Sequence, residues 1–214
     1  MVHVAFGSVL GSDRKMLKSR SGETVKLDAL LAEAVDRAAG AVREKNAEMS
    51  SAEQAVVARQ VGIGSVKYAD LSTDRIKDYV FDWDRMLSFD GNTAPYLQYA
   101  HARICSIFRR AGIDRSSVRT MTPLLGHSSE RALAMRLLQF DTAVWDTVEK
   151  YAPHRLCTYL YELASEFSSF YEQCPVLKAE NEQLRSSRLA LCDFTARVMQ
   201  RGLELLGIES PEQM

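Results

Sequence analysis

The chain has 214 residues, of which 46% are hydrophobic and 26% charged, and its formal net charge is −1. This composition is typical of one or two folded domains and excludes disordered, collagen-like and low-complexity proteins. No apolar run approaches the ~18 residues of a transmembrane helix, and no secretion signal opens the chain, so we expect a cytoplasmic protein without membrane contacts. A near-neutral chain is also no general nucleic-acid binder, so any such contact must come from a local face.

The cysteines and histidines do not follow a metal-binding pattern. The closest two of the four cysteines are 17 residues apart, and no two histidines are paired at helical spacing. We therefore expect reduced thiols in a core and no metal site.

A strand and a basic loop open the chain. Residues 3–10 are β-rich, and Gly11 to Asp13 provide a turn. Residues 14–22 follow as a basic loop, and residues 1–26 carry a net charge of +3. Because a lone strand exposes both edges, we expect it to pack irregularly on helices or to pair with another chain.

Helical periodicity dominates from residue 27 onward. Apolar residues recur at helical spacing over 27–42, and a second helix is expected from Ser50 or Ser51 to about Gly62 or Gly64. Further helices are expected over 95–111 with Thr93 as N-cap, over 129–150, behind Pro153, and from about 183 to 206 with Gly207 after the end. The expected fold class is therefore mainly α, with a helical bundle behind the short strand and basic loop.

Charge is unevenly shared along these helices. Residues 101–119 have a net charge of +4 and residues 141–182 a net charge of −5. Each region is either a solvated helix surface or a surface for a charged partner.

The basic loop carries the most specific pattern. Lys15 and Lys18 lie three residues apart just after a strand. Lysine suits phosphate oxygens, and phosphoryl or adenylyl transfer needs cations where negative charge develops. The alternative is a solvated basic loop.

The amino-acid sequence of this loop resembles that of a known family. Residues 15–19, Lys-Met-Leu-Lys-Ser, are similar to the Lys-Met-Ser-Lys-Ser signature of class I aminoacyl-tRNA synthetases, with Leu17 at the middle serine. The surroundings resemble the arginyl-tRNA synthetase family in particular. Blocks that carry this resemblance are residues 3–11, 18–22, 62–71, 81–88, 91–104, 170–177 and 202–214.

The resemblance implies a domain organisation. Residues 1–26 would be the tail of a catalytic core with the KMSKS-like loop, residues 27–90 connecting helices, and residues 91–214 a helical DALR-type anticodon-binding domain. In the family, Lys15 and Lys18 would act in catalysis, and both would contact ATP together with Arg20.

The helical domain would bind arginine tRNA. Recognition of a single-stranded loop uses aromatic rings for base stacking and cations for phosphates. Candidate tRNA contacts are Tyr96, Tyr99, Arg103, Arg109, Arg110 and Met214, the last at an anticodon base, with Phe170 and Tyr171 as further candidate stackers. Core packing is the alternative for the aromatic residues, a solvated face for the arginines and a frayed end for Met214.

The family's catalytic half is absent from this sequence. Class I synthetases carry a His-x-Gly-His motif, and no two histidines here have that spacing. We therefore expect the tRNA-binding C-terminal part of an arginine–tRNA ligase that is inactive alone, either as a fragment of the enzyme or as one half of a split enzyme with a separate N-terminal half. The alternatives are a free-standing, non-catalytic tRNA-binding protein and a helical bundle without an RNA role; no DNA or membrane partner is expected.

Overall fold

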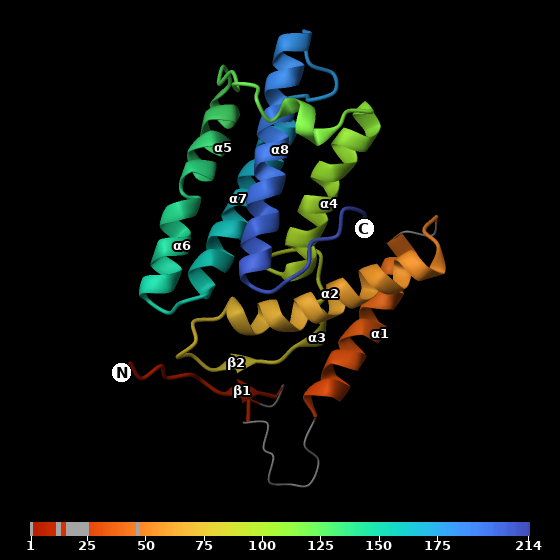
Figure 1. Cartoon of the computed structure of the whole chain (residues 1–214). Coiled ribbons are helices and arrows are strands. Elements are labelled where there is room, and N and C mark those ends of the chain that lie inside the picture. The colour runs from red at the N-terminus through yellow and green to blue at the C-terminus, as the bar shows by residue number, and fades with distance from the viewer. Residues whose placement is uncertain (1, 12–13, 16–25, 46–47) are drawn as a thin grey trace.

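Helices dominate the computed structural model, which describes residues 2–11, 14–15, 26–45 and 48–214 (Figure 1). The elements are β1 (Val9–Leu10), α1 (Leu27–Lys45), α2 (Ser51–Leu71), β2 (Tyr79–Val80), α3 (Trp83–Met86), α4 (Ala94–Ala111), the 3-10 helix η2 (Arg115–Val118), α5 (Ser128–Leu138), α6 (Phe140–Glu149), α7 (His154–Gln173) and α8 (Glu182–Leu205). The expected mainly α fold is confirmed. Helices α4 to α8 stand together as a bundle, α2 lies across its lower end, and the two strands lie below α2 (Figure 1).

The N-terminal strand pairs within the chain, which contradicts both outcomes expected for it. β1 and β2 are parallel, with Val9 opposite Tyr79 and Leu10 opposite Val80. The strand is also shorter than predicted, because before it the Gly7 amide donates to the Arg75 carbonyl oxygen at 2.6 Å outside the ladder. A Cβ at Gly7 would lie 2.2 Å from the Lys77 carbonyl oxygen, so only glycine allows this approach.

Helix α2 begins as predicted and ends later. Ser50 caps it in a capping box with Glu53. The predicted end at Gly62 or Gly64 is wrong, because the helix continues to Leu71. A Cβ at Gly62 would lie 2.7 Å from backbone atoms of Ala34, so this glycine permits the close crossing of α1 over α2.

The helices of the bundle follow their sequence signals with one exception. Thr93 caps α4 by accepting the Tyr96 amide at 3.3 Å, and Gly207 after α8 has a φ of +69°. Residues 129–150 form two helices instead of one, with Gln139 as the C-cap of α5 and the residue before α6.

Two apolar clusters hold these elements together. The larger lies among the bundle helices and includes the fully buried Leu97, Leu160, Leu163 and Phe167. The smaller joins α1 to α2 through Ala38, Val42, Val57 and Val61, with Met214 packed against it. All four cysteines, each among the described residues, are buried free thiols. Within the described part of the chain, no helix is both long and apolar enough to cross a membrane.

Candidate nucleic-acid interface

Helix α4 presents three distinct faces. At 3.6 residues per turn, its apolar side turns to the bundle core and a second side turns to the C-terminal tail, residues 206–214. The third side, here called the outer face, carries two tyrosines and two arginines of α4 that are not fully buried. These are Tyr96, Tyr99, Arg103 and Arg110.

Rings from neighbouring elements support the outer face. The Tyr96 ring lies 5.6 Å from that of Tyr161 on α7, measured between centroids. The Tyr99 ring, with 43% of the residue exposed, lies edge-on to Phe89 at 6.3 Å. Exposed aromatic rings are the side chains on which unpaired bases stack.

Arg103 completes this face at its centre. Its guanidinium carbon lies 4.7 Å from the centroid of the Tyr171 ring on α7, a cation–π contact. Tyr171 in turn stacks on Phe167 of the core at 6.0 Å, with 27° between the ring planes. A cation is therefore held at a defined place over the half-buried Tyr171 ring, one turn of α4 beyond the exposed Tyr99.

Phe170 does not belong to this surface. It is fully buried in the bundle core, so the structure supports core packing and not base stacking as its role. Tyr171, one residue further along α7, is only partly buried and lies under Arg103.

The second side of α4 holds the C-terminal tail. Gln98 donates to the carbonyl oxygens of Gln60 at 3.1 Å and Glu209 at 2.8 Å, which ties α2, α4 and the tail together. Arg109 donates to the Glu212 carbonyl oxygen at 2.7 Å. Although it was predicted beside Arg110, Arg109 therefore faces away from the outer face, and we leave it out of the candidate surface.

His101 and Met214 also belong to the tail contacts. The Nδ1 atom of the fully buried His101 lies 3.0 Å from the Pro211 carbonyl oxygen, and burial lowers the pKa of its imidazole. Met214 is half-buried against the α1–α2 cluster, so the C-terminus is packed instead of frayed. The same cluster includes Leu87, two residues before the Phe89 that contacts Tyr99.

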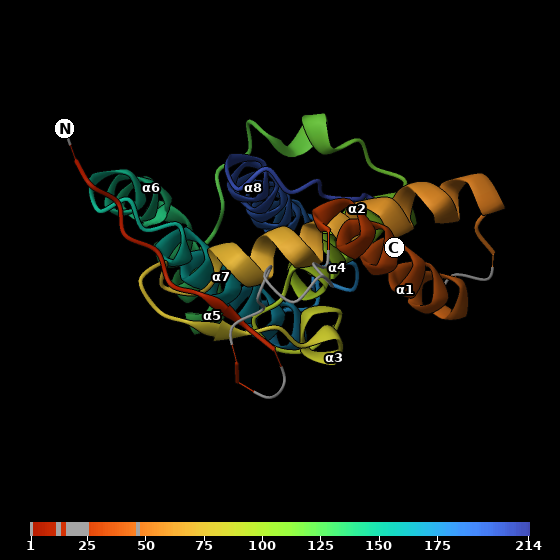
Figure 2. The ribbon, with the colours of Figure 1, turned by 90° about the horizontal axis from the view of Figure 1, so that it is seen from below.

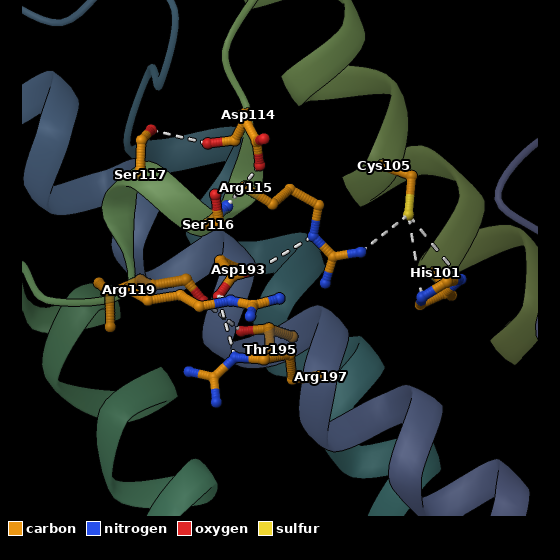
Figure 3. A network of polar contacts seen from close by, with 11 residues as sticks. His101, Cys105, Asp114, Arg115, Ser116, Ser117, Arg119, Asp193, Thr195 and Arg197 are labelled. Carbon is orange, nitrogen blue, oxygen red and sulfur yellow. Dashed lines mark hydrogen bonds and ion pairs between the residues drawn. The ribbon is translucent and has the colours of Figure 1, made fainter.

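Part of the basic stretch 101–119 is used inside the fold (Figure 3). Asp193 of α8 is buried, and its carboxylate receives Arg115 Nε and Arg197 Nε, each at 2.9 Å, with Arg119 Nε at 3.8 Å. These contacts fix η2 against α8. The sequence signal for this network is a lone acidic residue within the apolar run of 189–196, which sequence reasoning missed.

The basic loop is described only in part. Lys15 is exposed, and its carbonyl oxygen accepts the Gly11 amide at 2.9 Å in the turn that follows β1. It thus lies beyond the carboxyl end of a strand in a parallel pair, where α/β folds bind phosphate groups. Lys18 and Arg20 lie outside the described residues.

Two family models match successive parts of the chain. The model described as "tRNA synthetases class I (R), catalytic domain" matches residues 1–83, and "DALR anticodon binding domain" matches residues 97–214, more than half of the chain. The chain belongs to the arginyl-tRNA synthetase family. It matches the C-terminal part of these enzymes, and a free-standing tRNA-binding protein is not favoured, because the match extends into the catalytic domain.

Similar proteins align with nearly the whole chain. It is 54% identical to the arginine--tRNA ligase of Cellvibrio japonicus and 52% identical to that of Yersinia pseudotuberculosis, in each case over 99% of this chain and 37% of the relative. The arginyl-tRNA synthetase structure from Thermus thermophilus superposes with a TM-score of 0.87 at 38% identity, over 99% of this chain and 35% of that one. The Plasmodium falciparum enzyme gives 0.84 at 30%, with the same coverage. The chain thus spans little more than a third of the arginyl-tRNA synthetases it matches.

Proposed function

We propose that this chain binds the anticodon stem-loop of arginine tRNA through the outer face of α4. The observation that carries the proposal is the alignment of Tyr96, Tyr99, Arg103 and Arg110 along one side of a helix whose apolar side is buried in the bundle. Two relatives of the chain are arginine--tRNA ligases, and more than half of the chain matches an anticodon-binding family.

The chemistry of the outer face suits an RNA loop. Tyr99 offers an exposed ring to a base, and Arg103 offers both a guanidinium plane for stacking and donors for phosphate. Arg110, exposed two turns beyond Arg103, extends the positive charge toward the stem. The contact of Met214 with an anticodon base stays a prediction. Its side chain packs against the α1–α2 cluster, as does Leu87.

Catalysis requires more than this chain. We infer that it supports ATP-dependent attachment of arginine to tRNA only together with an N-terminal catalytic part, in the same polypeptide or as a separate partner. Lys15 follows the carboxyl end of β1, and this position supports the proposal that it binds ATP phosphates together with Lys18 and Arg20. A cytoplasmic location and the division at residues 26 and 90 belong to this proposal.

One experiment tests both halves of the proposal. Filter binding of the purified chain to arginine tRNA is expected to weaken steeply with salt and to weaken further when anticodon bases are replaced. The same preparation, supplied with arginine and ATP, should not aminoacylate the tRNA. Binding that ignores the anticodon would contradict the binding role, and robust aminoacylation would contradict the need for a second part.

A further inference from the structure

Helix α6 is packed in an unusual way for a helix of this bundle. None of its ten residues, all of which the structure describes, is buried. Yet it contains large apolar side chains, and Trp145 and Val148 are 67% and 63% exposed. Phe140, Ala143 and Val144 of α6 pack against the bundle core, so Trp145 and Val148 are apolar residues that the core leaves uncovered.

The exposed side of α6 continues onto its neighbours. Met135 and Leu138 of α5 and Tyr151 after α6 are each more than half exposed, and Leu138 reaches 71%. With Trp145 and Val148 they form what we call the α5–α6 apolar face. Single exposed apolar residues are ordinary, but five exposed large apolar residues within positions 135–151, Trp and Tyr included, are typical of a protein-binding surface.

Charge argues against RNA as the occupant of this face. Asp141, Asp146 and Glu149 lie among its residues on α6. Lys150 and Arg155 both pair with Asp146, each at 3.3 Å, so the helix offers phosphate little attraction. The occupant expected from this chemistry is an apolar protein surface.

The N-terminal segment extends the same surface. Phe6 is 86% exposed, and Phe6 and Pro153 line one cavity of about 500 Å³. Pro153 follows Tyr151 by two residues, so this end of the cavity is close along the chain to the end of the α5–α6 apolar face. In both views the chain passes beneath the lower end of α6 on its way to the N-terminus (Figures 1 and 2).

The segment that reaches this cavity belongs to the part matched by the catalytic-domain model, residues 1–83. The matched relatives are much longer, since the chain covers 37% of them. We propose that the α5–α6 apolar face is the docking surface for the remaining part of the class I catalytic domain. This inference rests on the proposed function for the existence of such a part, and it assigns α5 and α6 a role separate from the outer face of α4.

A chimaera provides the test. In it, this chain replaces the matching C-terminal 37% of the Cellvibrio japonicus arginine--tRNA ligase. Hydrogen exchange of the α6 backbone amides is compared between the chimaera and the isolated chain. Covering of the apolar face is expected to slow exchange in α6 by about tenfold or more. Equal exchange rates in the two proteins would overturn the proposal.

Paired substitutions give a second readout. Trp145→Gln with Val148→Gln should leave the melting temperature of the isolated chain nearly unchanged, because both side chains are exposed there, and should lower that of the chimaera. Val56→Gln, on a residue of α2 that is 57% exposed, is the control and should have little effect in either protein. Equal melting shifts in both proteins, or a dimer of the isolated chain that the pair dissolves, would contradict the assignment.

The tRNA affinity of the isolated chain separates this inference from the proposed function. We expect the α6 pair of substitutions to leave it unchanged. Loss of affinity in the α6 variant would reassign the face to RNA, whereas absence of tRNA binding in the unsubstituted chain would count against the proposed function alone.

Discussion

The guanidinium of Arg103 lies 4.7 Å from the centroid of the Tyr171 ring, and this contact links α4 to α7. Because Tyr171 also stacks on Phe167 in the core, the position of the cation is set from inside the bundle. A preorganised cation loses little side-chain entropy when it meets RNA, which favours binding. The contact therefore ties the packing of the bundle to the proposed recognition of the anticodon loop.

Replacement of Arg103 tests its contact with RNA. We expect Arg103→Ala to weaken binding of arginine tRNA by about tenfold and to reduce the slope of log affinity against log salt by about 1. The control is Arg155→Ala, because Arg155 lies at the start of α7 and pairs with Asp146. An unchanged salt slope in Arg103→Ala would remove this residue from the interface.

Two glycines test the crossing of α1 over α2. Gly62→Ala places a methyl group 2.7 Å from the Ala34 backbone, so we expect a loss of about 1–3 kcal/mol in the free energy of unfolding. Gly40→Ala meets no atom within 4 Å and should stabilise α1 by up to about 1 kcal/mol. Urea unfolding followed by circular dichroism measures both. Equal effects of the two substitutions would contradict the close crossing.

His101 makes stability depend on pH. Burial lowers the pKa of its imidazole below the usual 6.5, and Arg115 acts in the same direction, opposed by the Pro211 carbonyl and Glu212. Below about pH 6.5 the imidazole of His101 therefore binds a proton in the unfolded chain, whereas in the folded chain it binds one only at lower pH. The His101 contribution to the free energy of unfolding should therefore be constant above about pH 6.5. As the pH drops below 6.5, the free energy of unfolding should decrease by at most about 1.4 kcal/mol per pH unit.

The variant His101→Asn isolates this effect, since its amide can still donate to the Pro211 carbonyl oxygen but does not titrate. Urea unfolding at pH 7.5 and 5.5 should show a smaller difference for the variant than for the unsubstituted chain. The same difference in both proteins would assign the pH dependence to other groups.

The Asp193 network predicts unequal costs for its members. Asp193→Ala leaves the largely buried Arg115 without its carboxylate, and we expect a loss of about 3 kcal/mol in the free energy of unfolding. Arg119→Ala removes an exposed partner at 3.8 Å and should cost less than about 0.5 kcal/mol. Thermal unfolding of the two variants gives the comparison, and similar losses would mean that Asp193 is not the centre of the network.

Local signals predicted the helices well. The Thr93 cap, the Ser50 capping box and Gly207 mark real helix boundaries, because each acts through atoms within a few residues. The extension of α2 through Gly62 could not be predicted in the same way. There the nearby α1 backbone, and not helix propensity, decides the conformation.

Long-range contacts decide which of the predicted residues belong to the candidate site. The pairing of Val9 with Tyr79 joins residues 70 positions apart, which no local pattern specifies. Arg109 and Arg110 are adjacent in sequence but face the tail and the solvent respectively, since one residue turns the helix by about 100°. The basic stretch was therefore visible in the sequence, but the division of its arginines between fold and surface was not.

The affinity of Tyr99 variants for arginine tRNA tests the central claim most directly. The measurement compares Tyr99→Ala and Tyr99→Phe with the unsubstituted chain, using arginine tRNA and the same tRNA with substituted anticodon bases. Base stacking contributes about 1–3 kcal/mol whichever base is stacked, so Tyr99→Ala should weaken binding of both tRNAs by roughly 5- to 150-fold and Tyr99→Phe should keep the affinities of the unsubstituted chain. Unchanged affinity for arginine tRNA in Tyr99→Ala would contradict anticodon-loop recognition by the outer face of α4.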